Sequence, residues 1–356
     1  LLPSATSCAS LIPRKPLSPC PAASAAIALQ RSAQWLMPLT MIARLRHHFP
    51  ALASVAIRII GVALGYLVIV IIGRTWGPEG NGIYALVTQT AMFLSMVAIG
   101  GLDLSAVRQF SAVEAQQGRV SSGSLTALFA LTAVLILIPI ALLAFGGPSI
   151  LGWIIDGQFS SLAIAALAMT LAARAITRMV SAVLRTQGFF LTGQSFDIVI
   201  IPLLLIAVLL GGLVASLDDL LGWMIVTGAA SIALAVGTML VIHRRRATAH
   251  VTEQNVSVRA ILTGALPLWG VAVSATFADW YGLAVVTAQH GLADAGVFRV
   301  VMQIAVAFSI VSTGLFAVYS PRIGAAQSLG DWNKVARLVR SATWLSAALI
   351  LPAAIV

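Results

Sequence analysis

Long apolar runs separated by short polar stretches recur along the chain from residue 52 to its end. A helix needs about 20 apolar residues to cross the hydrocarbon core of a bilayer, so each run predicts a membrane-spanning helix. The ninth run begins near Leu338 and is still apolar at Val356, so we expect the sequence to be a C-terminally truncated fragment. The third predicted span lies between Arg119 and Asp156 and ends near Gly146, Gly147 and Pro148. The other predicted spans are residues 52–72, 83–104, 160–184, 198–217, 220–242, 260–287, 295–319 and a ninth from Leu338. Asp218 and Asp219 are expected to form a tight hairpin between the fifth and sixth spans.

A segment rich in Gly and Pro, residues 73–89, lies between the first two runs and recurs 214 positions later. Its glycines and proline suit a tight turn between antiparallel helices, and Tyr84 suits the aromatic belt at the membrane surface. Because the copies fall between equivalent apolar runs, we interpret the chain as two related halves. An even number of spans separates the copies, which predicts a parallel repeat about an axis along the membrane normal. The shift places Gly77, Gly82, Ile83, Tyr84, Val87, Gln89 and Arg108 over Gly291, Gly296, Val297, Phe298, Val301, Gln303 and Arg322.

Composition independently indicates a membrane protein. Hydrophobic residues make up 60% of the chain and charged residues 9%, with a mean hydropathy of +1.00. A water-soluble domain of this composition could not cover its surface with polar groups, so the expected fold class is an all-α polytopic transmembrane bundle. Residues 1–40 are expected to be a disordered or spurious leader. Both cysteines, Cys8 and Cys20, lie in this leader, so we expect no disulfide or thiol metal site in the remainder.

The net charge of +10 comes mainly from arginines in short loops, where positive charge sets membrane topology. Loops on one side carry nearly all of the Lys and Arg residues, whereas loops on the other side carry Arg74 alone. This asymmetry predicts a cytoplasmic N-terminus and places both copies of the Gly segment outside. The basic run HRRR, residues 243–246, is expected to anchor this topology, with contact to lipid head groups as a second role.

Several motifs along the chain resemble those of the polysaccharide flippases. These are the O-antigen and exopolysaccharide exporters of the multidrug/oligosaccharidyl-lipid/polysaccharide (MOP) superfamily. The resemblance covers residues 59 to about 340, and its specificity comes from the order and spacing of the motifs. They are GRTWGPEGNGIYALVTQ (residues 73–89), GGLDLSAVRQFS (100–111), ALPLW (265–269), ADAGVFRVV (293–301), YSPRI (319–323) and GDWNK (330–334).

The resemblance implies a MATE-like fold, in which two helical bundles surround a central cavity. Residues 41–246 would form the first six-helix bundle, and residues 247–356 the start of the second, with two helices and part of a third. It also implies a non-enzymatic transporter, without a cofactor, in the bacterial inner membrane. The implied substrate is a polyprenyl-diphosphate-linked oligosaccharide that moves from the inner to the outer leaflet. Implied partners are this anionic lipid-linked oligosaccharide, membrane lipids, and the polysaccharide polymerase and chain-length machinery, but no nucleic acid.

Charged residues inside the predicted spans are the candidate site. A charge at the bilayer centre costs about 2.5–3.5 kcal/mol on insertion scales, so a retained arginine usually faces a cavity or a partner. Arg174 lies roughly 16 Å from the cytoplasmic end of its helix, too deep for easy snorkelling, and shares a helical face with Arg178. Arginine pairs with phosphate oxygens through a planar fork of donors. We therefore predict that Arg58, Arg174, Arg178 and Arg299 bind a diphosphate head group.

Several of these residues have a second interpretation. Arg58 and Arg178 lie near the cytoplasmic interface and Arg299 lies near the outer one, so each could instead snorkel to it. Asp279 lies within the seventh span, where it either pairs with one of the arginines or carries a coupling cation.

Two other functions are alternatives to export of a lipid-linked oligosaccharide. A cation-coupled multidrug exporter of the same superfamily would favour an acidic cavity, whereas the deep charges here are mostly arginines. A membrane glycosyltransferase or polysaccharide polymerase would normally have large outer loops with acidic or Arg-rich clusters, and the outer loops here are short. The sequence has no HExxH, no GxSxG and no paired Cys-His cluster. We therefore favour alternating access around a cationic cavity.

Overall fold

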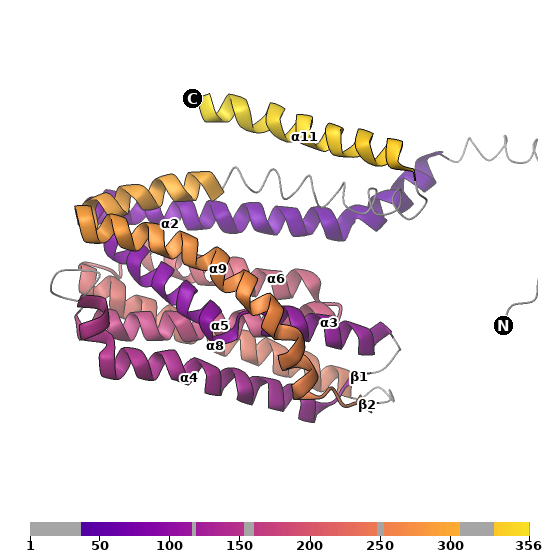
Figure 1. The fold of residues 1–356 in the computed structure, drawn as a ribbon, viewed down its shortest axis with the longest axis horizontal. Coiled ribbons are helices and arrows are strands. Elements are labelled where there is room, and N and C mark those ends of the chain that lie inside the picture. The colour runs from indigo at the N-terminus through magenta and orange to yellow at the C-terminus, as the bar shows by residue number, and fades with distance from the viewer. Residues whose placement is uncertain (1–36, 116–118, 153–159, 248–252, 307–330, 356) are drawn as a thin grey trace, which may run out of the picture. The chain divides into compact units, whose positions relative to one another are not determined.

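The computed structural model describes residues 37–115, 119–152, 160–247, 253–306 and 331–355. Nearly all elements in this part of the chain are helices, as the apolar runs predict (Figure 1). The chain divides into two units, Leu1–Phe49 and Pro50–Val356, and the description below concerns the second. Of the predicted leader, residues 1–36 lie outside the described residues and residues 37–40 belong to the first helix.

The helices are α2 (Met37–Ile99), α3 (Leu102–Ala115), α4 (Ser122–Gly152), α5 (Ser161–Thr186), α6 (Phe190–Ile198), α7 (Ile200–Leu210), α8 (Leu217–Ala247), α9 (Val258–His290) and α11 (Trp332–Ile355). A further helix spans residues 292–306, and we refer to it as the 292–306 helix. Two short strands, β1 (Arg119–Val120) and β2 (Glu253–Gln254), pair in parallel. Strand β1 precedes α4, and strand β2 precedes α9.

Five of the described helices are long and apolar enough to cross a membrane, or six if the bent pair α6 and α7 is one span. The apolar part of α2, Ala56–Ile99, has 44 residues. At 1.5 Å per residue it would be about 66 Å long, more than twice the hydrocarbon thickness of about 30 Å. It is interrupted at Gly77, so it supplies the first and second predicted spans, and the chain is a multi-pass membrane protein.

The two copies of the Gly segment share an unusual backbone conformation. Gly77 has φ 70° and ψ −168°, and its counterpart Gly291 has φ 86° and ψ −178°. Only glycine adopts this region readily, because any side chain would be strained there. At each glycine the chain doubles back, α2 on itself and α9 into the 292–306 helix (Figure 1). The repeat seen in the sequence therefore corresponds to two equivalent helical hairpins.

The two hairpins contact each other reciprocally. A Cβ atom at Gly82 would collide with the carbonyl of Leu292, and a Cβ atom at Gly296 would collide with the carbonyl of Pro78. Gly82 and Gly296 are equivalent in the repeat, and so are Pro78 and Leu292, because each pair is 214 positions apart. Each hairpin thus uses its second glycine to contact the residue that follows the first glycine of the other hairpin. Such a reciprocal contact is characteristic of two units related by a twofold axis. The hairpins are thus related by an approximate twofold axis between the two glycines.

The second half of α2 and the start of α3 run antiparallel to α9. The indole Nε1 of Trp280 donates to the hydroxyl of Thr90 at 3.0 Å, and that of Trp269 donates to the carbonyl of Val97 at 2.9 Å. Further along, the hydroxyl of Ser105 donates to the carbonyl of Ile261 at 2.7 Å. These bonds hold the first half of the chain to the second along the length of α9.

Helix α5 lies at the centre of the first bundle and packs on α3, α4, α6 and α8. Small residues let these neighbours approach closely, as is usual between membrane helices. Gly228 of α8, for example, packs on Met169 and Ala173 of α5. The α5 N-terminus is capped by Ser160, whose hydroxyl accepts a hydrogen bond from the backbone N–H of Ala163. The fourth predicted span is therefore found close to its predicted bounds.

Other boundaries differ from those predicted, each for a physical reason. The second span ends at Ile99, and Gly101, with φ 80°, separates it from the amphipathic helix α3. Hydropathy alone does not reveal α3, because it is short and partly polar. The third helix continues beyond Pro148 to Gly152, since a proline removes only one hydrogen bond and is tolerated in membrane helices.

The fifth and sixth spans also differ from the prediction. The fifth begins at Phe190, bends by 52° between α6 and α7, and ends at Leu210. Asp218 and Asp219 are not the turn but the first turn of α8. Asp219 accepts hydrogen bonds from the backbone N–H groups of Ala215 and Ser216, and its own N–H donates to the Ser216 hydroxyl, so Ser216 and Asp219 form a capping box at the start of α8.

Candidate functional site

Arg174 lies in the middle of α5, 13 residues from the first residue of that helix and 12 from the last. At 1.5 Å per residue this is about 18–20 Å from either end, close to the middle of a bilayer. Its Nε atom is buried and has no hydrogen-bond partner among the described residues. A buried guanidinium donor without an acceptor is costly, so this position is suited to receive an anionic group.

Arg299, from the other half of the chain, is a second cation within electrostatic range of Arg174. Its Nε atom is also buried without a partner among the described residues. Arg174 and Arg299 both lie close enough to the phenol of Tyr84 for their charges to act on it, and they also act on each other. Two like charges held together in a buried setting repel, and a bound anion would relieve that repulsion. We call Arg174, Arg299 and Tyr84 the arginine cluster.

Asp279 lies beside this cluster on α9. Its charge acts favourably on Arg299, but its side chain is exposed and forms no ion pair within 4.0 Å among the described residues. The pairing expected from the sequence is therefore a longer-range attraction here. Within the described residues no group of three or more His, Cys, Asp or Glu side chains is placed to hold a metal ion.

Arg178, one turn from Arg174, has a carboxylate partner. Its Nε donates to Oδ2 of Asp103 at 2.7 Å, and the Asp103 side chain is only 2% exposed while that of Arg178 is 28% exposed. Asp103 is buried between α3 and α5. Arg178 therefore links these two helices, in addition to any contact with substrate.

Arg58 is exposed on the first half of α2 and is not joined to the arginine cluster. Its helical face includes Gly61 and Gly65, small residues that let a neighbouring helix approach closely. Gly61 contacts Ile198 at the bend between α6 and α7, and Gly65 contacts the amide of Gln303. This face is therefore covered by neighbouring helices from both halves, and Arg58 stands at its end.

The space beside Arg174 is nearly closed. A cavity of about 20 Å³ lies between α2, α5, α7 and α8, which is room for about one water molecule. Its polar groups are the Tyr84 hydroxyl, the Arg174 side chain and three threonine hydroxyls, of which those of Thr88 and Thr227 donate to backbone carbonyls of their own helices. The cavity is lined by Tyr84, Thr88, Thr170, Ala173, Arg174, Ile201, Leu205, Met224, Thr227 and Gly228. A diphosphate could enter only if the surrounding helices separate.

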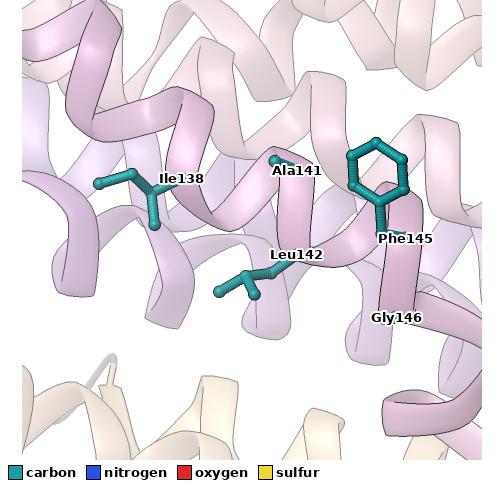
Figure 2. A pocket seen from close by; sticks show the side chains of 5 residues that line it. All are labelled: Ile138, Ala141, Leu142, Phe145 and Gly146. Carbon is teal, nitrogen blue, oxygen red and sulfur yellow. The ribbon is translucent and has the colours of Figure 1, made fainter.

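Two larger hollows lie elsewhere on the first bundle. One of about 540 Å³ lies along α4 alone and is lined by Ile138, Ala141, Leu142, Phe145 and Gly146 (Figure 2). It has no charged or hydroxyl side chain, and Phe145 is 92% exposed, as expected for a surface in contact with lipid. The other, of about 650 Å³, is a cleft between α4, α5 and α8, lined by Ser122, Leu125, Thr126, Phe129, Ala130, Thr132, Ala133, Ile176, Val236, Met239, Leu240 and His243.

Of the four predicted arginines, the structure brings Arg174 and Arg299 together, pairs Arg178 with Asp103 and leaves Arg58 apart. Sequence reasoning missed the role of Tyr84, which was assigned to the aromatic belt. Tyr84 is equivalent to Phe298 in the repeat and differs from it by a hydroxyl group. That difference could have indicated a polar environment around Tyr84.

Comparison with known proteins adds independent information. The sequence profile of a family described as polysaccharide biosynthesis protein matches residues 51–327. Among solved structures, the chain is similar to the MATE multidrug transporter DinF-BH, at 15% identity and a TM-score of 0.53, over 83% of this chain and 69% of that one. It is also similar to a chain described as protein A, at 16% identity and a TM-score of 0.50, over 81% of this chain and 66% of that one. No curated protein matches the sequence. The MATE-like fold expected from the sequence is thereby confirmed.

Proposed function

The chain belongs to the polysaccharide biosynthesis protein family of the MOP superfamily, and we propose that it exports a polyprenyl-diphosphate-linked oligosaccharide across the bacterial inner membrane. The proposal makes it a transporter that moves the glycan to the outer leaflet for cell-surface polysaccharide synthesis, and not an enzyme. The observation that carries it is the arginine cluster. Two half-buried arginines, one from each half, have buried Nε donors without acceptors among the described residues.

An anionic head group matches this cluster better than a cationic drug does. The unpaired Nε donors of Arg174 and Arg299 cost free energy when they are buried. Phosphate oxygens that accept hydrogen bonds from them would offset this cost, because charge-assisted hydrogen bonds are strongest where water is excluded. A cation would add a third positive charge to the two already present. We assign Arg174 and Arg299 to direct contact with the diphosphate, and Tyr84 to a neutral hydrogen bond beside them.

Arg58 and Arg178 take a different part in this proposal. Arg178 remains 28% exposed although it pairs with Asp103, and Arg58 is exposed on α2. Both lie toward the predicted cytoplasmic side, where the substrate is loaded. We assign them to the first electrostatic attraction of the head group, with Asp279 drawing Arg299 back when the site is empty.

Movement of the substrate follows from the closed state of the cavity. The 20 Å³ space beside Arg174 is too small for a diphosphate, so the helices around it must move apart to admit one. In the proposed cycle the two halves separate on one side to load the substrate and on the other to release it. On the predicted outer side, the halves meet at Gly82 and Gly296 with no side chain between their backbones. We propose that this contact, called here the glycine gate, closes the outer exit and opens when the glycan leaves.

A reconstituted transport assay tests the proposal. The full-length protein is placed in vesicles with a fluorescent polyprenyl-diphosphate oligosaccharide, and its transfer between leaflets is followed with a membrane-impermeant quencher. We expect transfer by the wild type, and a loss of at least about tenfold for Arg174→Gln and Arg299→Gln, equal to about 1.4 kcal/mol of lost binding. Arg108→Gln is the matched control, because Arg108 is exposed on α3 and outside the cluster.

Other outcomes point to other functions. If the wild type transfers no glycan but exchanges cationic dyes for protons or sodium, the multidrug exporter is favoured and Asp279 becomes the residue to study. If it extends the glycan instead of moving it, the protein is a transferase or polymerase. Equal losses for Arg174→Gln and Arg108→Gln would show that the cluster has no special role.

A further inference from the structure

The cleft between α4, α5 and α8 has no part in the proposed transport path. It is lined on α5 by Ile176, which is two residues from Arg174. Because successive helical residues are about 100° apart, Ile176 and Arg174 point to nearly opposite sides of α5. The cleft and the arginine cluster therefore lie on different faces of one helix. With a volume of about 650 Å³, the cleft falls in the range of small-ligand sites, about 300–1,000 Å³.

The cleft opens sideways and is apolar along most of its length. Its rim on α4 is formed by Ser122, Thr126, Ala130 and Ala133, which are exposed and lie on one helical face, and its rim on α8 includes the exposed Leu240. From Ser122 to Ala133 the rim is about 16 Å long, at 1.5 Å per residue. One leaflet of the hydrocarbon core is about 15 Å thick. The apolar part thus matches the depth of one lipid chain.

The titratable groups of the cleft lie at one end, and that end is basic. There the hydroxyl of Ser122 lies 3.1 Å from Nε2 of His243. Arg244 and Arg245 follow directly in α8 and are exposed. None of the cleft residues is acidic, and the first turn of α4 has no acidic residue. The Lys and Arg asymmetry of the loops predicts that this end faces the cytoplasm, where anionic lipids attract basic clusters beside membrane helices.

We propose that this cleft binds one acyl chain of an anionic phospholipid from the cytoplasmic leaflet, with the lipid phosphate at Ser122, His243 and Arg244. The chain fills the apolar groove between α4 and α8, and the hydroxyl, imidazole and guanidinium groups supply donors to the phosphate oxygens. The two requirements, an apolar groove of one leaflet's depth and a basic end on the same side, are met together here. The other hollow on α4 has the apolar surface without the basic end (Figure 2).

Native mass spectrometry of the full-length protein in detergent tests the site. The protein is titrated with dioleoyl phosphatidylglycerol or with dioleoyl phosphatidylcholine, which have the same chains and different head-group charge. We expect the first phosphatidylglycerol to bind about tenfold more tightly than phosphatidylcholine, because both lipids have a phosphate but the positively charged choline group is repelled by the basic end of the cleft. Ala133→Trp should remove this preference by filling the groove. Ala141→Trp is the matched control, since Ala141 is an exposed alanine on the same helix, in the other hollow.

The outcomes separate the proposal from its rivals and from the transport function. Retention of the preference in Ala141→Trp and its loss in Ala133→Trp support the site. Equal binding of the two lipids by the wild type, or the same effect of both substitutions, overturns it. If Ala133→Trp does not fold, Ala130→Trp, one turn nearer the basic end, makes the same test. None of these measurements needs transport, so a failed transport assay leaves the result intact.

Discussion

The glycine gate permits a quantitative prediction. A Cβ atom at Gly82 would lie 2.8 Å from the carbonyl carbon of Leu292, in addition to its collision with the oxygen. Carbon atoms in contact are normally about 3.5–4.0 Å apart, so Gly82→Ala must push the two hairpins apart by roughly 0.7 Å or more. Overpacking of this kind costs about 1–3 kcal/mol. This cost destabilises only the conformation in which the glycine gate is closed. The ratio of open to closed molecules should therefore rise by about 5- to 150-fold.

Labelling of a cysteine below the gate measures that population. Thr88 lines the small cavity and is replaced by cysteine, and Cys8→Ser with Cys20→Ser removes the two cysteines of this sequence. In intact cells a membrane-impermeant maleimide should label Thr88→Cys at least about tenfold faster when Gly82→Ala is added, since labelling follows the open fraction.

Gly270→Ala is the control for this experiment. Gly270 is a helical glycine of α9 with open space where its Cβ would stand, so alanine there should leave labelling unchanged. An unchanged rate in a folded Gly82→Ala protein would refute the gate, and so would an equal rise in Gly270→Ala.

Three further substitutions follow from the packing. Asp103→Asn should lower the stability of the detergent-purified protein by about 1.5–3 kcal/mol in thermal unfolding, because Arg178 loses a buried charged acceptor; an unchanged melting temperature contradicts this. Gly61→Ala should destabilise by about 1–3 kcal/mol, since its Cβ would meet the branched side chain of Ile198, and wild-type stability would show that the bend adjusts freely. Arg174→Lys should slow glycan transfer by about tenfold although the charge is kept, because lysine lacks the planar fork; full activity would mean that charge alone suffices.

The sequence predicted the helical class, the spans and the repeat because these depend on local composition and on self-similarity. Gly77 and Gly291 were recognisable because only glycine tolerates their backbone conformation. The bend at Val199 was missed although Pro202 follows within one turn, because a proline in an apolar run can either bend a membrane helix or be accommodated in it. Helix α3 was missed because its stability comes from packing against α5 and α9, which hydropathy does not record.

The candidate site was predictable in part. The depth of Arg174 singled it out, because burial of a charge is costly wherever the helix lies. Its proximity to Arg299 required the arrangement of two helices more than a hundred residues apart in the chain. The partner of Arg178 was equally hidden, because Asp103 is 75 positions away and approaches only after α3 folds against α5. Which residues meet across a bundle depends on helix rotation, and that is not encoded in any one stretch.

The reciprocal contact at the glycine gate shows two hairpins in nearly symmetric positions, yet the residues around them differ between the two halves. Two identical six-helix chains meeting across a twofold axis would make the same contact, and every residue near the axis would then occur twice. In a single fused chain the copies are free to diverge. Ala85 and Arg299 occupy equivalent positions, and so do Tyr84 and Phe298, so one copy has a neutral residue where the other has a cation. A dimer of identical chains must present the same face to both ends of a ligand. This chain presents different faces, so the proposed substrate, a lipid with one charged end and one sugar end, can be held in a single orientation.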